Sequence, residues 1–146
     1  MQETATVRDG ELRLNLELRR GLPVAAVDRR LQEACRGKDL CSRALGFYFA
    51  DLEDRGAHAE LGFKSVSELA RMRLRMAPST ANEYKTVSRG LDQLPHLEAA
   101  FAREELCWSQ VRLLSRVAIP QTDEQWVTYA KSRRIAWPAS TCNRRA

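Results

Sequence analysis

The residues best suited to ligand chemistry lie between positions 79 and 90, where amide, hydroxyl and basic groups recur at helical spacing. At 100° per residue, one side of a helix over 79–90 carries Ser79, Asn82, Lys85, Thr86 and Arg89. The opposite side carries Ala81, Tyr84, Ser88 and Leu91. Asparagine pairs with adenine and arginine with guanine, and hydroxyls reach base edges or phosphate. The pattern favours an exposed face that contacts duplex DNA; the alternative is an ordinary solvated face of a helical bundle.

The charge distribution points the same way. The chain has 146 residues and a formal net charge of +5. Two basic blocks, residues 64–90 with a net charge of +4 and residues 131–146 with +5, stand apart from residues 1–63 with −1 and residues 91–130 with −3. We expect four cations of the first block to neutralise phosphate: Arg71, Arg75, Lys85 and Arg89. Releasing counterions from about four phosphates gives a log–log salt slope of about −3.6.

Two helices must position this face. Ser65 and Glu68 form a capping box, in which the hydroxyl and the carboxylate satisfy amides at the start of a helix. That helix should run from Ser65 to Met76, and a turn of about three residues containing Pro78 should lead into a helix over 79–90. The sequence therefore predicts a helix-turn-helix at 65–90, whose second helix enters the major groove.

The rest of the chain also reads as helical, so we expect an all-α bundle of five to seven helices over 22–131. Helices should begin near Pro23, Asp39 and Pro95, and the first should end at Arg36-Gly37. Gly46 indicates close packing in the second of these helices. Thr122 or Asp123 should cap the last helix. From Ser132 the periodicity is lost, so 132–146 should be a basic, disordered tail.

The N-terminal segment, residues 1–21, has a different pattern. Four leucines alternate strictly with polar residues: Leu12, Leu14, Leu16 and Leu18. A period of two is a strand signal, and a lone strand needs a partner, which could be the same segment (11–20) of a second chain. The alternative is an extended arm.

Several functional classes find no support in the residues. Cys35, Cys41, Cys107 and Cys142 form no C-x-x-C pair, and only two histidines, His58 and His96, could assist them. Phosphate-loop and hydrolase motifs are also missing. We therefore expect no metal, no cofactor, no small-molecule substrate and no catalysis. No apolar run is long enough for a membrane span or an export signal, so we expect a cytoplasmic protein.

The order of several short motifs resembles the helical N-terminal region of bacterial HNH endonuclease-type proteins. These motifs are 62–70 (GFKSVSELA), 76–81 (MAPSTA), Leu94-Pro95 and 101–114 (FAREELCWSQVRLL). The chain also resembles, more distantly, the helix-turn-helix of ParB-type partition proteins. The resemblance implies an all-α, DNA-associated module with Ser79–Gly90 as the recognition helix. It departs from the pattern at Ala77, where the usual serine cap is replaced.

Taken together, the sequence predicts a non-catalytic, double-stranded DNA-binding protein of bacterial type. HNH nucleases use paired histidines that this chain lacks. Two alternatives remain open: a protein-interaction or dimerisation module, and an inactive fragment of an HNH nuclease.

Overall fold

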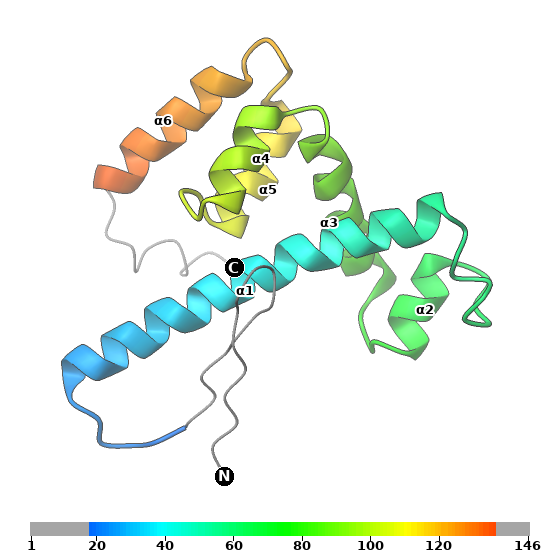
Figure 1. The fold of residues 1–146 in the computed structure, drawn as a ribbon, viewed down its shortest axis with the longest axis horizontal. Helices are drawn as coiled ribbons and strands as arrows, with labels where there is room; N and C mark the ends of the chain where they lie inside the picture. The colour runs from blue at the N-terminus through cyan, green and yellow to red at the C-terminus, as the bar shows by residue number, and fades with distance from the viewer. Residues whose placement is uncertain (1–17, 137–146) are drawn as a thin grey trace. The chain divides into compact units, whose positions relative to one another are not determined.

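The computed structural model describes residues 18–136, and these residues form six α-helices and no strand (Figure 1). The predicted all-α, multi-helix fold is therefore confirmed. The helices are α1 (Val24–Asp54), α2 (Val66–Met72), α3 (Pro78–Leu91), α4 (Pro95–Ala102), α5 (Trp108–Val117) and α6 (Asp123–Ala136).

Helix α1 corrects the prediction of two helices. It continues for 31 residues through Gly37, where a helix end was expected. A glycine costs a helix about 1 kcal/mol relative to alanine, and no proline follows to stop it, so good helix formers on either side carry the helix through. The chain divides into two compact units, residues 1–41 and 42–146, and the boundary lies within α1.

In the first unit, apolar residues recur at helical spacing near the start of α1, a pattern that predicts a buried face, but they do not pack into a core. Val24, Val27 and Leu31 are exposed. The predicted strand or arm and the proposed dimer contact at 11–20 fall almost wholly outside the described residues. Leu18, which lies inside them, is exposed.

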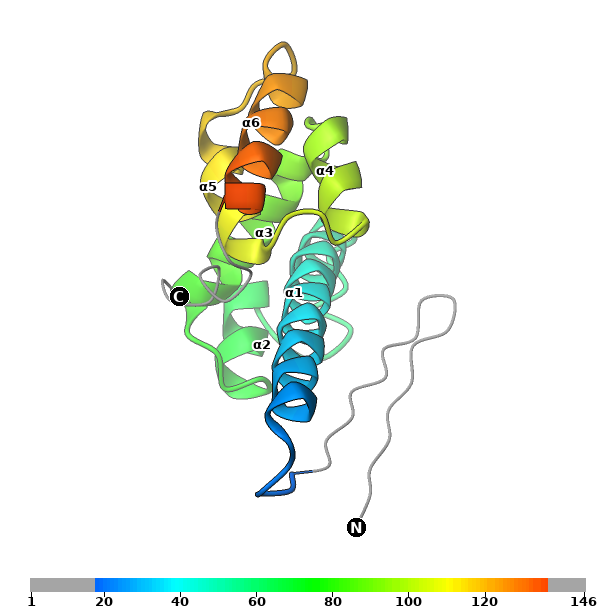
Figure 2. The same cartoon turned by 90° about the vertical axis from the view of Figure 1, so that its left-hand side faces the viewer.

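The second unit has two apolar cores, one toward each end of α3. Figure 2 shows α4, α5 and α6 grouped near one end of α3 and α2 near the other. The larger core joins α3 to α4, α5 and α6 through Val87, Leu91, Leu94, Leu97, Ala100, Phe101, Leu106, Val111, Leu114, Val127 and Ala130. The smaller core joins the end of α1 to α2 and α3 through Phe49, Val66, Ala70 and Ala81. Both ends of α3 are thus fixed by burial, which leaves only one side of this helix open.

A close contact between α1 and α3 depends on Gly46. A Cβ atom built on Gly46 would lie 2.7 Å from the backbone oxygen of Tyr84 and 3.1 Å from the Cβ of Ser88. Only glycine allows the two helices to approach this closely, so the close packing predicted from the sequence is confirmed. The contact places the last turn of α1 alongside α3.

The Ser65 cap of α2 forms as predicted, but Glu68 reaches back to the amide of Lys64 and not to that of Ser65, so the reciprocal half of the capping box does not form. The Glu68 amide donates to the Ser65 hydroxyl over 3.1 Å, and the Glu68 carboxylate accepts from the Lys64 amide over 2.6 Å. The predicted end at Met76 is wrong, because α2 stops at Met72. Arg75 adopts a left-handed backbone with φ of 52°, which turns the chain so that the Met76 amide donates to the Ala70 carbonyl over 2.9 Å.

The N-terminus of α4 is capped by a carboxylate from another helix. Asp123, the first residue of α6, is fully buried and accepts from the amides of His96 and Leu97 over 2.7 and 3.0 Å. An anion is favoured at this position, where unpaired amides and the helix dipole converge. Asp123, one of the two residues expected to cap the last helix, therefore ties α6 to α4.

The C-terminal boundary also differs from the prediction. Helix α6 extends to Ala136, so the tail predicted from residue 132 is helical over its first five residues. Residues 137–146 lie outside the description. Among the described helices, none is both long enough and apolar enough to cross a bilayer.

We predict opposite effects on stability for alanine substitutions at Gly46 in α1 and Gly90 in α3. Gly46→Ala should destabilise the protein by about 1–3 kcal/mol, because its methyl group meets the Tyr84 backbone, which cannot move aside easily. Gly90→Ala meets Ser115 only at 3.6 Å, an ordinary contact, and should stabilise α3 by about 0.5 kcal/mol. Urea unfolding measures both changes; equal effects would refute the close contact.

We also predict that Asp123→Ala lowers the free energy of unfolding by about 2–3 kcal/mol, since the buried amide of Leu97 and the part-buried amide of His96 lose a charged acceptor. Asp123→Asn keeps one acceptor oxygen and should cost less. The control is Glu124→Gln, an exposed neighbour in the same helical turn. Thermal and urea unfolding compare the three variants, and an Asp123→Ala protein as stable as the control would show that the cap is dispensable.

Candidate nucleic-acid interface

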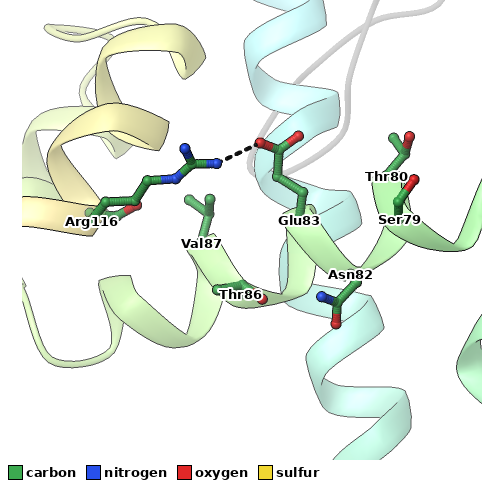
Figure 3. A pocket seen from close by; sticks show the side chains of 8 residues that line it. Ser79, Thr80, Asn82, Glu83, Thr86, Val87 and Arg116 are labelled. Atoms are coloured by element: carbon green, nitrogen blue, oxygen red, sulfur yellow. Dashed lines mark hydrogen bonds and ion pairs between the residues drawn. The ribbon is translucent and has the colours of Figure 1, made fainter.

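The open side of α3 carries an uncharged hydrogen-bonding surface, which we call the α3 stripe: Ser79, Asn82 and Thr86. All three residues are exposed, whereas Ala81, Val87 and Leu91 fix the helix from its buried sides. The stripe lines an open pocket of about 550 Å³, together with Thr80, Glu83 and residues Ser115 and Arg116 of α5 (Figure 3). The helix begins at Pro78, and Ala77 supplies no side-chain cap, as its residue type implies.

One edge of the stripe is occupied by ion pairs with the end of α1. We call Glu53, Asp54, Lys85 and Arg89 the α1 cluster. Lys85 pairs with Glu53, and the Arg89 guanidinium lies 3.1 Å from Glu53 Oε1 and 2.9 Å from Asp54 Oδ1. Two carboxylates thus compensate two cations, and the α1 cluster carries no net charge.

The α1 cluster shifts the acidity of its members. The hydrogen bond from Lys85 lowers the pKa of Glu53 below its ordinary value, with the charges of Lys85 and Arg89 acting in the same direction. The hydrogen bond to Asp54 raises the pKa of Arg89. Lys85 is the more enclosed cation, with 18% of its side chain exposed against 40% for Arg89. Both cations therefore have carboxylate partners before any ligand arrives.

The other edge of the stripe has a different balance. We call Glu83, Arg112 and Arg116 the α5 cluster. Glu83 Oε1 accepts from Arg112 Nη1 over 3.3 Å and from Arg116 Nη2 over 3.1 Å, as Figure 3 shows for Arg116. One carboxylate faces two guanidinium groups, so the α5 cluster keeps a net charge of +1. The Arg116 side chain is 63% exposed.

The two remaining predicted cations lie before α3. Arg71 is exposed near the end of α2, and Arg75 is exposed in the turn that leads to α3. Neither forms an ion pair within the described part of the chain. Between them, Arg73 lies over the Phe63 ring, 5.1 Å from its centroid. Arg71 and Arg75 are consequently available to an external anion.

The structure thus divides the seven sequence-predicted residues into three groups. Ser79, Asn82 and Thr86 meet in one pocket; Lys85 and Arg89 lie at its edge against carboxylates; Arg71 and Arg75 lie in α2 and the turn. The sequence reasoning missed the α5 cluster. Its signal was the spacing of Arg112 and Arg116, four residues apart on an amphipathic helix, which places them on one face.

No three His, Cys, Asp or Glu side chains among residues 18–136 gather closely enough to hold a metal ion. His58 follows α1 and His96 lies in the first turn of α4. The chain matches no family model, no curated protein and no solved structure.

We predict that Lys85→Gln raises the pKa of Glu53 toward its ordinary value, because the hydrogen bond that lowers it is removed. Carbon-detected NMR of the side-chain carboxyl measures this pKa, with Lys64→Gln as the control. A carboxyl with a lowered native pKa stabilises the fold above its unfolded-state pKa. This contribution is lost as the pH falls through the native pKa. An unchanged Glu53 titration in Lys85→Gln would contradict the ion pair.

Proposed function

We propose that this protein is a non-catalytic DNA-binding protein in which α2 and α3 act as a helix-turn-helix. The observation that carries the proposal is the α3 stripe, an exposed and uncharged hydrogen-bonding surface on a helix that is anchored on both flanks. In a helix-turn-helix the second helix lies in the major groove and the first braces it. Here α2 and α3 contact each other and share the smaller core.

The chemistry of the stripe suits base edges. The Asn82 amide offers a donor and an acceptor, the pair that adenine N7 and N6 require. The hydroxyls of Ser79 and Thr86 serve either base edges or phosphate oxygens. Uncharged groups discriminate between bases through hydrogen bonds. The non-specific attraction to the phosphate backbone comes from cations near the stripe.

Arg71 and Arg75 supply such attraction in the proposed complex. Both precede α3, and neither is engaged by a carboxylate in the described residues, so phosphate does not have to displace an internal partner. A bacterial protein that binds chromosomal DNA must be in the cytoplasm, so the proposed function implies that location. The HNH endonuclease-type relationship remains a prediction from the sequence motifs.

The test is a fluorescence-anisotropy titration of labelled random duplex DNA at 50 mM salt. We expect wild-type protein to bind and Asn82→Ala/Thr86→Ala to weaken binding to a selected target by about 10-fold or more, since a good side-chain-to-base pair contributes about 1–3 kcal/mol. Affinity for random duplex should change little, because cations outside the stripe provide it.

The matched control is Gln125→Ala/Thr128→Ala, which removes one amide and one hydroxyl from exposed positions of α6. It should bind both duplexes as wild type does. Absence of wild-type binding at low salt refutes the proposed function. Equal binding by the stripe variant and the control to a selected target refutes the role of the α3 stripe.

A further inference from the structure

The two edges of the α3 stripe differ in charge although each contains two cations. At the α1 edge, Glu53 and Asp54 balance Lys85 and Arg89. At the α5 edge, Glu83 alone faces Arg112 and Arg116. An approaching phosphate therefore meets two carboxylates on one side and a surplus guanidinium on the other.

Accessibility reinforces this difference. Arg116 is the most exposed arginine in either cluster, at 63%, compared with 40% for Arg89 and 32% for Arg112. It also lines the same pocket as Asn82 and Thr86, and Figure 3 shows it extending from α5 toward α3. A ligand on the stripe would reach Arg116 without rearrangement of the helices.

Groove dimensions connect these observations. The major groove is about 12 Å wide, and an α-helix with its side chains is about 10–12 Å across. A helix in the groove therefore has phosphate backbone passing close to its edges. By electrostatic complementarity, the edge with net positive charge attracts this phosphate backbone more strongly than the balanced edge does.

We propose that a duplex bound to the α3 stripe places a backbone phosphate at the α5 edge, where Arg116 binds it. This inference rests on the proposed function and adds a residue that the sequence did not single out. Glu83 is a positioning residue, because it holds Arg112 and Arg116 beside the stripe. Lys85 and Arg89 remain with their carboxylates and contribute little to phosphate binding.

Salt-dependent binding to random duplex DNA tests this assignment. Arg116→Gln should reduce the magnitude of the log–log salt slope by about 0.9 and weaken binding about eightfold at 0.1 M salt, the effect of one lost phosphate contact. Arg116→Lys keeps the charge and should keep most of the slope. Arg89→Gln/Asp54→Asn removes a balanced pair from the α1 edge and should leave the slope unchanged.

The control for a general loss of positive charge is Arg133→Gln in α6, a residue outside the pocket. It should change the slope by less than Arg116→Gln does. If wild type binds and Arg116→Gln retains its slope, the inference is overturned while DNA binding stands. A salt slope that is reduced by about 0.9 in Arg89→Gln/Asp54→Asn also overturns the inference. Failure of wild type to bind refutes the proposed function itself.

Discussion

The contact between Gly46 of α1 and the backbone of α3 determines which side of α3 is buried and which charges lie beside the α3 stripe. With no side chain at position 46, the two helices approach until the Tyr84 carbonyl almost touches α1. One helical side of α3 is thereby buried, and the last turn of α1 delivers Glu53 and Asp54 to Lys85 and Arg89. A bulkier residue at position 46 would disturb both the packing of α3 and the charge at one edge of the stripe.

The charge distribution around α3 depends on which helices pack beside it more than on the amino-acid composition of α3 and its neighbours in sequence. Charge counted along the sequence makes residues 64–90 a strongly basic block. In space, two carboxylates from outside that block neutralise two of its cations, while α5 adds Arg112 and Arg116 with a single shared carboxylate. Exposed ion pairs contribute little to stability, so the main effect of these clusters is on the charge of the surface beside α3, which is balanced at the α1 edge and positive at the α5 edge.

Local sequence signals predicted much of the fold. Ser65 and Glu68 begin α2, Pro95 begins α4, and the apolar spacing places Ala81 and Leu91 in the cores. The errors concern where helices end: α1 continues through Gly37, because a single glycine without a following proline does not stop a helix, and α2 stops at Met72, before Arg75 takes a left-handed backbone. For the site, wheel arithmetic placed Asn82 and Thr86 outward, but no local pattern could reveal that Glu53 meets Lys85, 32 residues away.

The buried Asp123 has a consequence for the order in which the chain acquires structure during synthesis. The first turn of α4 depends on a carboxylate 27 residues further along the chain. A ribosome must therefore translate the whole of α5 and reach α6 before α4 receives its partner. Until then the nascent helix has bare amides at its start, and the larger core lacks Val127 and Ala130. The C-terminal helices should thus fold together as one late unit.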